Sequence, residues 1–133
     1  MAHDISFSTF LFAPPDEVME LLTNPEFIAE WSGNKAVFEK KAGGKFEMFD
    51  GWVSGTVLSV SDNELTYTWK ATDWDANAEN SEVKFKLLAV EHGTEVFVEH
   101  KNLPTKEEAD AHLDGWKKHF FDPIGEYLSN RKF

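Results

Sequence analysis

The sequence predicts one α+β domain in which a curved antiparallel sheet wraps around a long C-terminal helix. Three observations favour this fold class. Between residues 36 and 101, apolar and polar residues alternate and turn dipeptides recur, which is typical of antiparallel strands. Proline-led helical patterns precede this region, and a long helical pattern follows it. The 133 residues contain no linker or repeat, so we expect a single domain over residues 1–133.

The first strand is predicted over residues 5–12, because apolar and small polar side chains alternate there. Pro14 and Pro15 end this strand and suit the first turn of a short helix. Asn24, as an N-cap, and Pro25 repeat the signal and begin a second short helix. We therefore expect two short helices directly after the first strand.

Six antiparallel strands are predicted within residues 36–101. Turn signals such as Asp50-Gly51 and His92-Gly93 separate them. The clearest strands place on one face Leu65, Tyr67, Trp69 and Ala71, then Val83, Phe85 and Leu87, then Val96, Val98 and His100. Because Thr, Lys and Glu alternate with these residues, the sheet is expected to have one buried and one wet face.

A helix of about 25 residues is predicted to begin after Thr105, which forms a capping box with Glu108. Pro123 is expected to bend this helix, because it lacks a backbone donor. Gly115 lies in the helix interior, where it costs about 1 kcal/mol relative to alanine, and we expect the helix to approach a strand or a ligand closely there. The predicted buried stripe is Ala109, Leu113, Trp116, Phe120, Ile124 and Tyr127.

The composition excludes several classes of function. The chain has 24 acidic and 13 basic side chains, a formal net charge of −11. A nucleic-acid partner is not expected, because phosphate binding needs clustered Lys and Arg. The chain has no cysteine, which excludes disulfides, thiolate metal sites and a cysteine nucleophile.

The sequence also predicts a cytoplasmic location. No apolar run approaches the roughly 18 residues of a membrane-spanning helix, so we expect no membrane span. Residues 1–9 lack the basic start and the continuous apolar block of a secretory signal.

His100 and His112 are the candidates for acid–base chemistry, because imidazole titrates near neutral pH. Neither has an evident nucleophile partner, a third metal ligand or HExxH spacing. The acidic stretch 73–80 lacks the glycine and the final glutamate of a calcium loop, and we expect an exposed loop there. The sequence thus predicts no metal, no cofactor and no assigned catalytic residue.

Several short strings resemble the C-terminal domain of the family called activator of heat-shock protein 90 ATPase homologues. In chain order they are Trp31, Gly43-Gly44-Lys45-Phe46, Asp50-Gly51, Gly55, Val57, Leu65, Trp69, Gly93-Thr94, Val96, Val98, His100 and Gly115-Trp116. The resemblance covers essentially the whole chain. It implies the helix-grip fold of the START-like superfamily (SRPBCC, birch-pollen-allergen-like), which matches the predicted order of elements.

The resemblance also implies a cavity between the sheet and the long helix that accepts an apolar ligand. The residues expected to line this cavity, by matching position and facing, are Trp31, Phe46, Trp69, Phe85, His100, His112 and Trp116. Eukaryotic members of the family bind the chaperone and stimulate its ATPase with the help of a further N-terminal domain. A chaperone is therefore a second partner that the resemblance implies.

Three functions remain open from the sequence. The leading hypothesis is a non-enzymatic binding protein with an internal cavity for a small hydrophobic or amphipathic ligand. The second is a chaperone-associated module that acts through an acidic surface on the two short helices, formed by Asp16, Glu17, Glu20, Glu26 and Glu30. The third is a small-molecule enzyme that uses His100 or His112.

Overall fold

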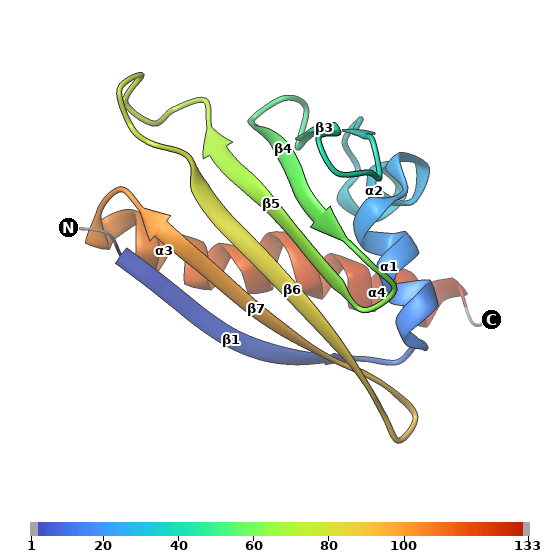
Figure 1. The fold of residues 1–133 in the computed structure, drawn as a ribbon. Coiled ribbons are helices and arrows are strands. Elements are labelled where there is room, and N and C mark those ends of the chain that lie inside the picture. Colours follow the sequence, from blue (N-terminus) through green and yellow to red (C-terminus); the bar gives the residue numbers. More distant parts are fainter. Residues whose placement is uncertain (1–2, 132–133) are drawn as a thin grey trace.

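The structure is a computed structural model that describes residues 3–131, and it has the predicted α+β architecture (Figure 1). An antiparallel sheet of seven strands, in the order β1-β7-β6-β5-β4-β3-β2, curves around a long helical rod. The strands are β1 (His3–Leu11), β2 (Val37–Phe38), β3 (Lys45–Met48), β4 (Val53–Val60), β5 (Glu64–Ala71), β6 (Ser81–Val90) and β7 (Gly93–Leu103). The helical segments are α1 (Pro15–Thr23), α2 (Pro25–Ser32), α3 (Lys106–Gly115), η1 (Trp116–Phe121) and α4 (Asp122–Arg131).

The last strand in chain order, β7, lies beside the first strand, β1. β1 pairs with β7, and Ile5 lies opposite His100 while Phe7 lies opposite Val98. Strand β2 forms the other edge of the sheet, so α1 and α2 carry the chain from one edge to the other. The six strands expected within residues 36–101 are confirmed as β2 to β7.

The two short helices form where the proline signals predicted them. The Asn24 side chain accepts a hydrogen bond from the backbone N–H of Glu26 at 3.0 Å, as an N-cap does. The Trp31 indole N–H donates to the backbone oxygen of Leu21 at 2.8 Å. This bond joins α2 to α1 and satisfies a buried polar group of each helix.

The alternation predicted for the central strands is confirmed, because the residues assigned to the inner face are buried. They include Leu65, Tyr67, Trp69, Ala71, Val83, Phe85, Leu87, Val96, Val98 and His100. The long helical rod lies across this face (Figure 1). Its aromatic residues Trp116, Phe120 and Phe121 are buried in the same core. Full burial of each large apolar side chain contributes about 1.5–3 kcal/mol, so this layer supplies most of the driving force for folding.

The long helix begins at its predicted cap, since the Thr105 hydroxyl accepts from the backbone N–H of Glu108 at 3.0 Å. Its middle differs from the prediction, because η1 is π-helical rather than α-helical. The N–H of Asp122 bonds to the oxygen of Lys117, five residues back. The irregularity expected at Pro123 thus takes the form of a widened turn directly before the proline, which cannot donate a backbone hydrogen bond.

The helical residues that face the sheet differ in part from the predicted stripe. The predicted stripe is wrong at Leu113, which is 45% exposed, and His112 takes the buried position instead. After the widened turn, Phe121 and Leu128 are buried as well, whereas Tyr127 is only half-buried. Only the shift from Tyr127 to Leu128 follows from the wider turn, because a uniform period of 3.6 residues cannot continue through it.

Within residues 3–131, no helix is both long and apolar enough to cross a bilayer.

Candidate functional site

A cleft of about 370 Å³ opens between the long helix and one end of the sheet. Its volume lies in the range of small-molecule sites. The lining comes from the β3–β4 turn, the end of β5 with the loop that follows, and one side of α3 and η1. The lining residues are Phe49, Trp52, Trp69, Asp73, Glu108, Ala111, His112, Gly115, Trp116, His119 and Phe120.

Three of the seven residues expected to line a cavity, Trp69, His112 and Trp116, lie in this cleft. Trp31 packs behind it against Phe120, with ring centroids 4.7 Å apart. Phe85 also contacts Phe120 from the sheet side, with stacked rings 6.1 Å apart. Trp31 and Phe85 are therefore core residues that support the floor of the cleft.

Phe46 and His100 also lie outside the cleft lining. The Phe46 ring packs on Tyr67 in the core, with centroids 4.5 Å apart. His100 is fully buried and contacts the cleft only through Trp116, whose indole N–H donates to His100 Nδ1 at 3.1 Å. The sequence thus placed three of its seven expected residues in the cleft lining, and the other four are core side chains outside that lining.

The outer wall comes from the β3–β4 turn, whose residues were not predicted from the sequence to line a cavity. Phe49, Asp50 and Gly51 have φ values of 55°, 58° and 83°, and the Trp52 N–H closes the turn on the Phe49 oxygen at 3.2 Å. A positive φ is costly for a bulky residue such as Phe49. The turn places Phe49 and Trp52 over the cleft, and the aromatic residues on either side of the Asp-Gly pair were the available signal.

The helix wall is formed by residues spaced about one turn apart, from Glu108 through His112 and Gly115 to His119. A Cβ atom added to Gly115 would meet only the His119 Cδ2, at 3.8 Å. The expected close approach of a strand to Gly115 is therefore wrong. The missing side chain leaves open space in the cleft instead.

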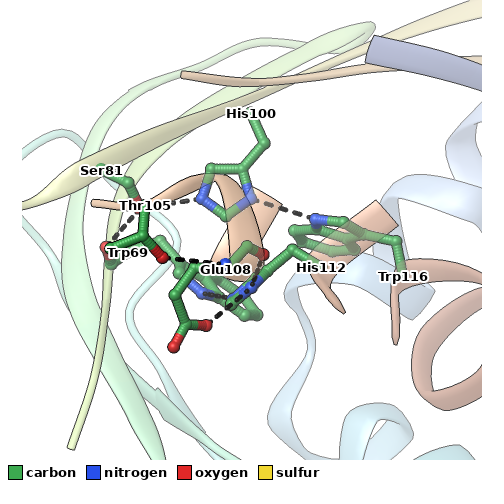
Figure 2. A network of polar contacts seen from close by, with 7 residues as sticks. All are labelled: Trp69, Ser81, His100, Thr105, Glu108, His112 and Trp116. Carbon is green, nitrogen blue, oxygen red and sulfur yellow. Dashed lines mark hydrogen bonds and ion pairs between the residues drawn. The ribbon is translucent and has the colours of Figure 1, made fainter. Parts of the chain in front are cut away.

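His112 is held in one tautomer by its two partners (Figure 2). The Trp69 indole N–H donates to His112 Nε2 at 3.1 Å, and His112 Nδ1 lies 2.9 Å from the Glu108 backbone oxygen. An indole nitrogen can only donate, so Nε2 must accept and carries no proton. The proton is therefore on Nδ1, which donates to the Glu108 carbonyl.

His100 is held in the opposite tautomer (Figure 2). Trp116 donates to its Nδ1, so the proton lies on Nε2, which is 2.8 Å from the Ser81 hydroxyl oxygen. The Ser81 hydroxyl in turn donates to the backbone oxygen of Trp69. Each polar hydrogen of this buried network has an acceptor, which is the condition under which burial is tolerated.

Burial keeps both imidazoles neutral. Desolvation, followed by repulsion from His112, lowers the pKa of His100 to about 3. Desolvation also lowers the pKa of His112, against the opposing effects of its bond to the Glu108 backbone and of the Glu108 and Asp73 carboxylates. Because both nitrogens of each ring are engaged, neither histidine presents a free lone pair to the cleft. The geometry therefore does not favour acid–base catalysis by His100 or His112.

The acidic loop after β5 was expected to be exposed, and one of its residues is not. Trp74 is buried and its ring packs against His112, with centroids 5.7 Å apart. Asp73, beside it, reaches the cleft while remaining exposed. Across residues 3–131, no three His, Asp or Glu side chains lie close enough together to hold a metal ion.

Comparison with protein families shows which known proteins this chain resembles. The family model described as "Activator of Hsp90 ATPase homolog 1-like protein" matches residues 12–129. A human relative, "Activator of 90 kDa heat shock protein ATPase homolog 1", is 27% identical over 117 residues. That match covers 87% of this chain and 34% of the relative, so the chain spans about a third of the curated relatives' length.

Solved structures share the fold. An HSP90 activator from Plasmodium falciparum superposes with a TM-score of 0.84 at 24% identity, covering 97% of this chain and 96% of that one. A Mesorhizobium loti protein superposes with a TM-score of 0.78 at 26% identity, covering 96% of this chain and 98% of that one. The fold and the family predicted from the sequence are both confirmed.

Proposed function

The chain belongs to the family of activator of Hsp90 ATPase homolog 1-like proteins, and we propose that it is a binding protein whose cleft holds a small apolar or amphipathic molecule without transforming it. The cleft beside Trp52 and Gly115 carries this proposal. Its volume of about 370 Å³ suits a small ligand, and five of its eleven lining residues are Phe or Trp.

Two local features support a binding role, because each lowers the stability of the folded protein. Glycine in the helix at position 115 costs about 1 kcal/mol relative to alanine, yet no neighbouring backbone requires it. The positive φ of Phe49 adds strain in the opposite wall. Trp52 also remains 36% exposed at the cleft, where a ligand would cover it.

The first experiment is native mass spectrometry of the protein purified gently from its own host, compared with its denatured mass. The proposal predicts an additional non-covalent mass that is lost on denaturation. Its chemical identification would then name the ligand. A clean unliganded mass, together with no response to a library of small apolar compounds, would count against the proposal.

The cleft is tested directly by Gly115→Leu. The added side chain has room at its Cβ and should fill the cleft while the protein stays folded, so ligand binding should be lost. Gly125→Leu is the matched control, because Gly125 lies in α4, outside the cleft lining, and a Cβ there has no neighbour within 4 Å. Equal binding by both variants would contradict the assignment of the cleft.

The family comparison favours a second candidate function, a module that associates with a chaperone. The acidic residues of α1 and α2 would supply the contact, since Asp16, Glu26 and Glu30 are exposed there. This candidate is tested by titrating the chain into the chaperone of its own host and measuring the ATPase rate and binding. No binding and an unchanged ATPase rate would contradict this candidate function. If binding occurs, replacing Asp16, Glu26 and Glu30 together by lysine should weaken it and so identify the surface.

A further inference from the structure

We propose that the ligand of the cleft is a flat aromatic molecule that carries a positive charge. This inference rests on the proposed function, because it specifies the chemistry of the same cleft. It depends on two features of the lining that are independent of each other: the arrangement of the aromatic rings and the sign of the charged groups.

The aromatic rings offer surfaces for a planar guest. Trp52, from the β3–β4 turn, lies nearly parallel to the His112 ring of the helix wall, at 25° with centroids 6.2 Å apart. It lies edge-on to Trp69, at 80° and 6.3 Å. Trp116 and Phe120 continue the floor with centroids 4.8 Å apart. Rings on both the turn and the helix can therefore present faces or edges to an inserted planar group.

The ionisable groups of the lining favour a cation. They are Asp73, Glu108, His112 and His119, and the lining contains no Lys or Arg. Over residues 3–131, the ion-pair contact of the Glu108 carboxylate is to His112 Nδ1 at 3.5 Å, and Asp73 has no cationic partner within 4 Å. Because His112 is locked neutral by Trp69, neither carboxylate is neutralised by a positive side chain in the cleft.

The indole faces, like the carboxylates, favour a cation over an anion. A cation over a tryptophan face is attracted by the ring, and this attraction is larger in partly desolvated sites. The two indole N–H groups of the inner wall are already engaged with histidines and are not available to bind an anion. The overall charge of −11 further raises the local concentration of cations.

The test uses three compounds that share a two-ring skeleton and differ in charge: N-methylquinolinium, methylnaphthalene and naphthoate. Each is titrated into the protein at low salt while the Trp52 indole N–H resonance is followed by NMR. The expected order of affinity is cation, then neutral compound, then anion, with the cation binding about tenfold more tightly than the neutral isostere. Equal affinities for cation and neutral compound would overturn the inference.

Variants that neutralise single carboxylates test which residues cause the preference for a cation. Asp73→Asn and Glu108→Gln should each reduce the affinity for N-methylquinolinium towards that for methylnaphthalene, with the latter unchanged. Glu107→Gln is the matched control, because Glu107 lies in the same helical turn with the same charge but is exposed and outside the cleft. A loss of cation affinity in the control equal to that in Glu108→Gln would show a general charge effect and overturn the inference.

The outcomes separate the inference from the proposed function. If the neutral or anionic compound binds best and Gly115→Leu abolishes that binding, the cleft is a ligand site and only its charge preference is wrong. If none of the three compounds binds and the native mass is also clean, both proposals fail. Recovery of an anionic ligand from the host protein would overturn the inference while supporting the proposed function.

Discussion

Desolvation keeps the two buried histidines neutral, and each accepts a hydrogen bond from a tryptophan. A protonated imidazole has donors on both nitrogens, so it would place an N–H opposite the Trp69 or the Trp116 N–H. Protonation of either ring therefore requires its indole partner to move. At the scale of single residues, the protonation state of each histidine is therefore coupled to the packing of its tryptophan partner in the core.

This coupling predicts that the protein loses stability in mild acid. Both pKa values are lowered by folding, so below pH 6.5 the unfolded chain binds protons that the folded chain does not, and stability falls as pH falls. For His100 the loss continues down to about pH 3. His100 should contribute most of this loss, because its folded pKa lies furthest below 6.5, and His112 acts in the same direction.

Urea unfolding between about pH 7 and pH 5 measures this effect with little interference from carboxylates. His100→Asn should be less stable at pH 7 and should show a shallower decrease than the wild type. His92→Asn is the control, because the His92 ring is exposed and asparagine tolerates its positive φ. A decrease of equal slope in wild type and His100→Asn would show that His100 does not titrate on unfolding.

At the scale of the elements, glycines serve two different purposes in this fold. Gly55 in β4 allows a close approach of backbones, since an added Cβ would lie 2.0 Å from the Thr68 oxygen. Gly115 in α3 has no such neighbour and borders the cleft. Their substitution by alanine should therefore have opposite effects on stability.

We expect Gly115→Ala to stabilise the protein by about 0.5–1 kcal/mol, because alanine is the better helix former and its methyl group fits. We expect Gly55→Ala to destabilise it by about 1–3 kcal/mol, because strand β4 must move away from β5. Denaturant midpoints of the two variants test both effects. A destabilised Gly115→Ala would indicate a packing role for this glycine and weaken its assignment to the cleft.

At the scale of the whole molecule, the acidic charge is not balanced by ion pairs. The ion pairs in the described part of the chain are mostly exposed, as for Lys40 with Glu20 and Lys106 with Asp110. Such pairs contribute little to stability. A net charge of −11 on a small domain therefore leaves mutual repulsion that folding has to overcome.

Salt should consequently stabilise this protein. Raising sodium chloride from about 0.02 M to about 0.5 M screens the repulsion between carboxylates and should raise the thermal midpoint by a few degrees. Calorimetry at pH 8 measures this shift. A midpoint that falls with salt would mean that attractive pairs, rather than net repulsion, dominate the electrostatics.

The sequence by itself determined the order of elements, the caps at Asn24 and Thr105, and the buried faces of the strands. These features depend on local hydrogen bonds and on a period of two, which neighbouring residues encode directly. The series of short motifs from Trp31 to Gly115-Trp116, taken together, also sufficed to identify the family. The cleft lining was predicted only in part, because alternation shows which side of a strand is buried but not where the buried layer is open.

Only the tertiary structure decided the composition of the site. The packing of α3 against the sheet buried His112 rather than Leu113, and the strained turn brought Trp52 to the cleft. The hydrogen bond from Trp69 to His112 joins side chains 43 residues apart, and it sets the tautomer of the imidazole. Such contacts depend on how the sheet and helix pack against each other, which no local pattern of residues specifies.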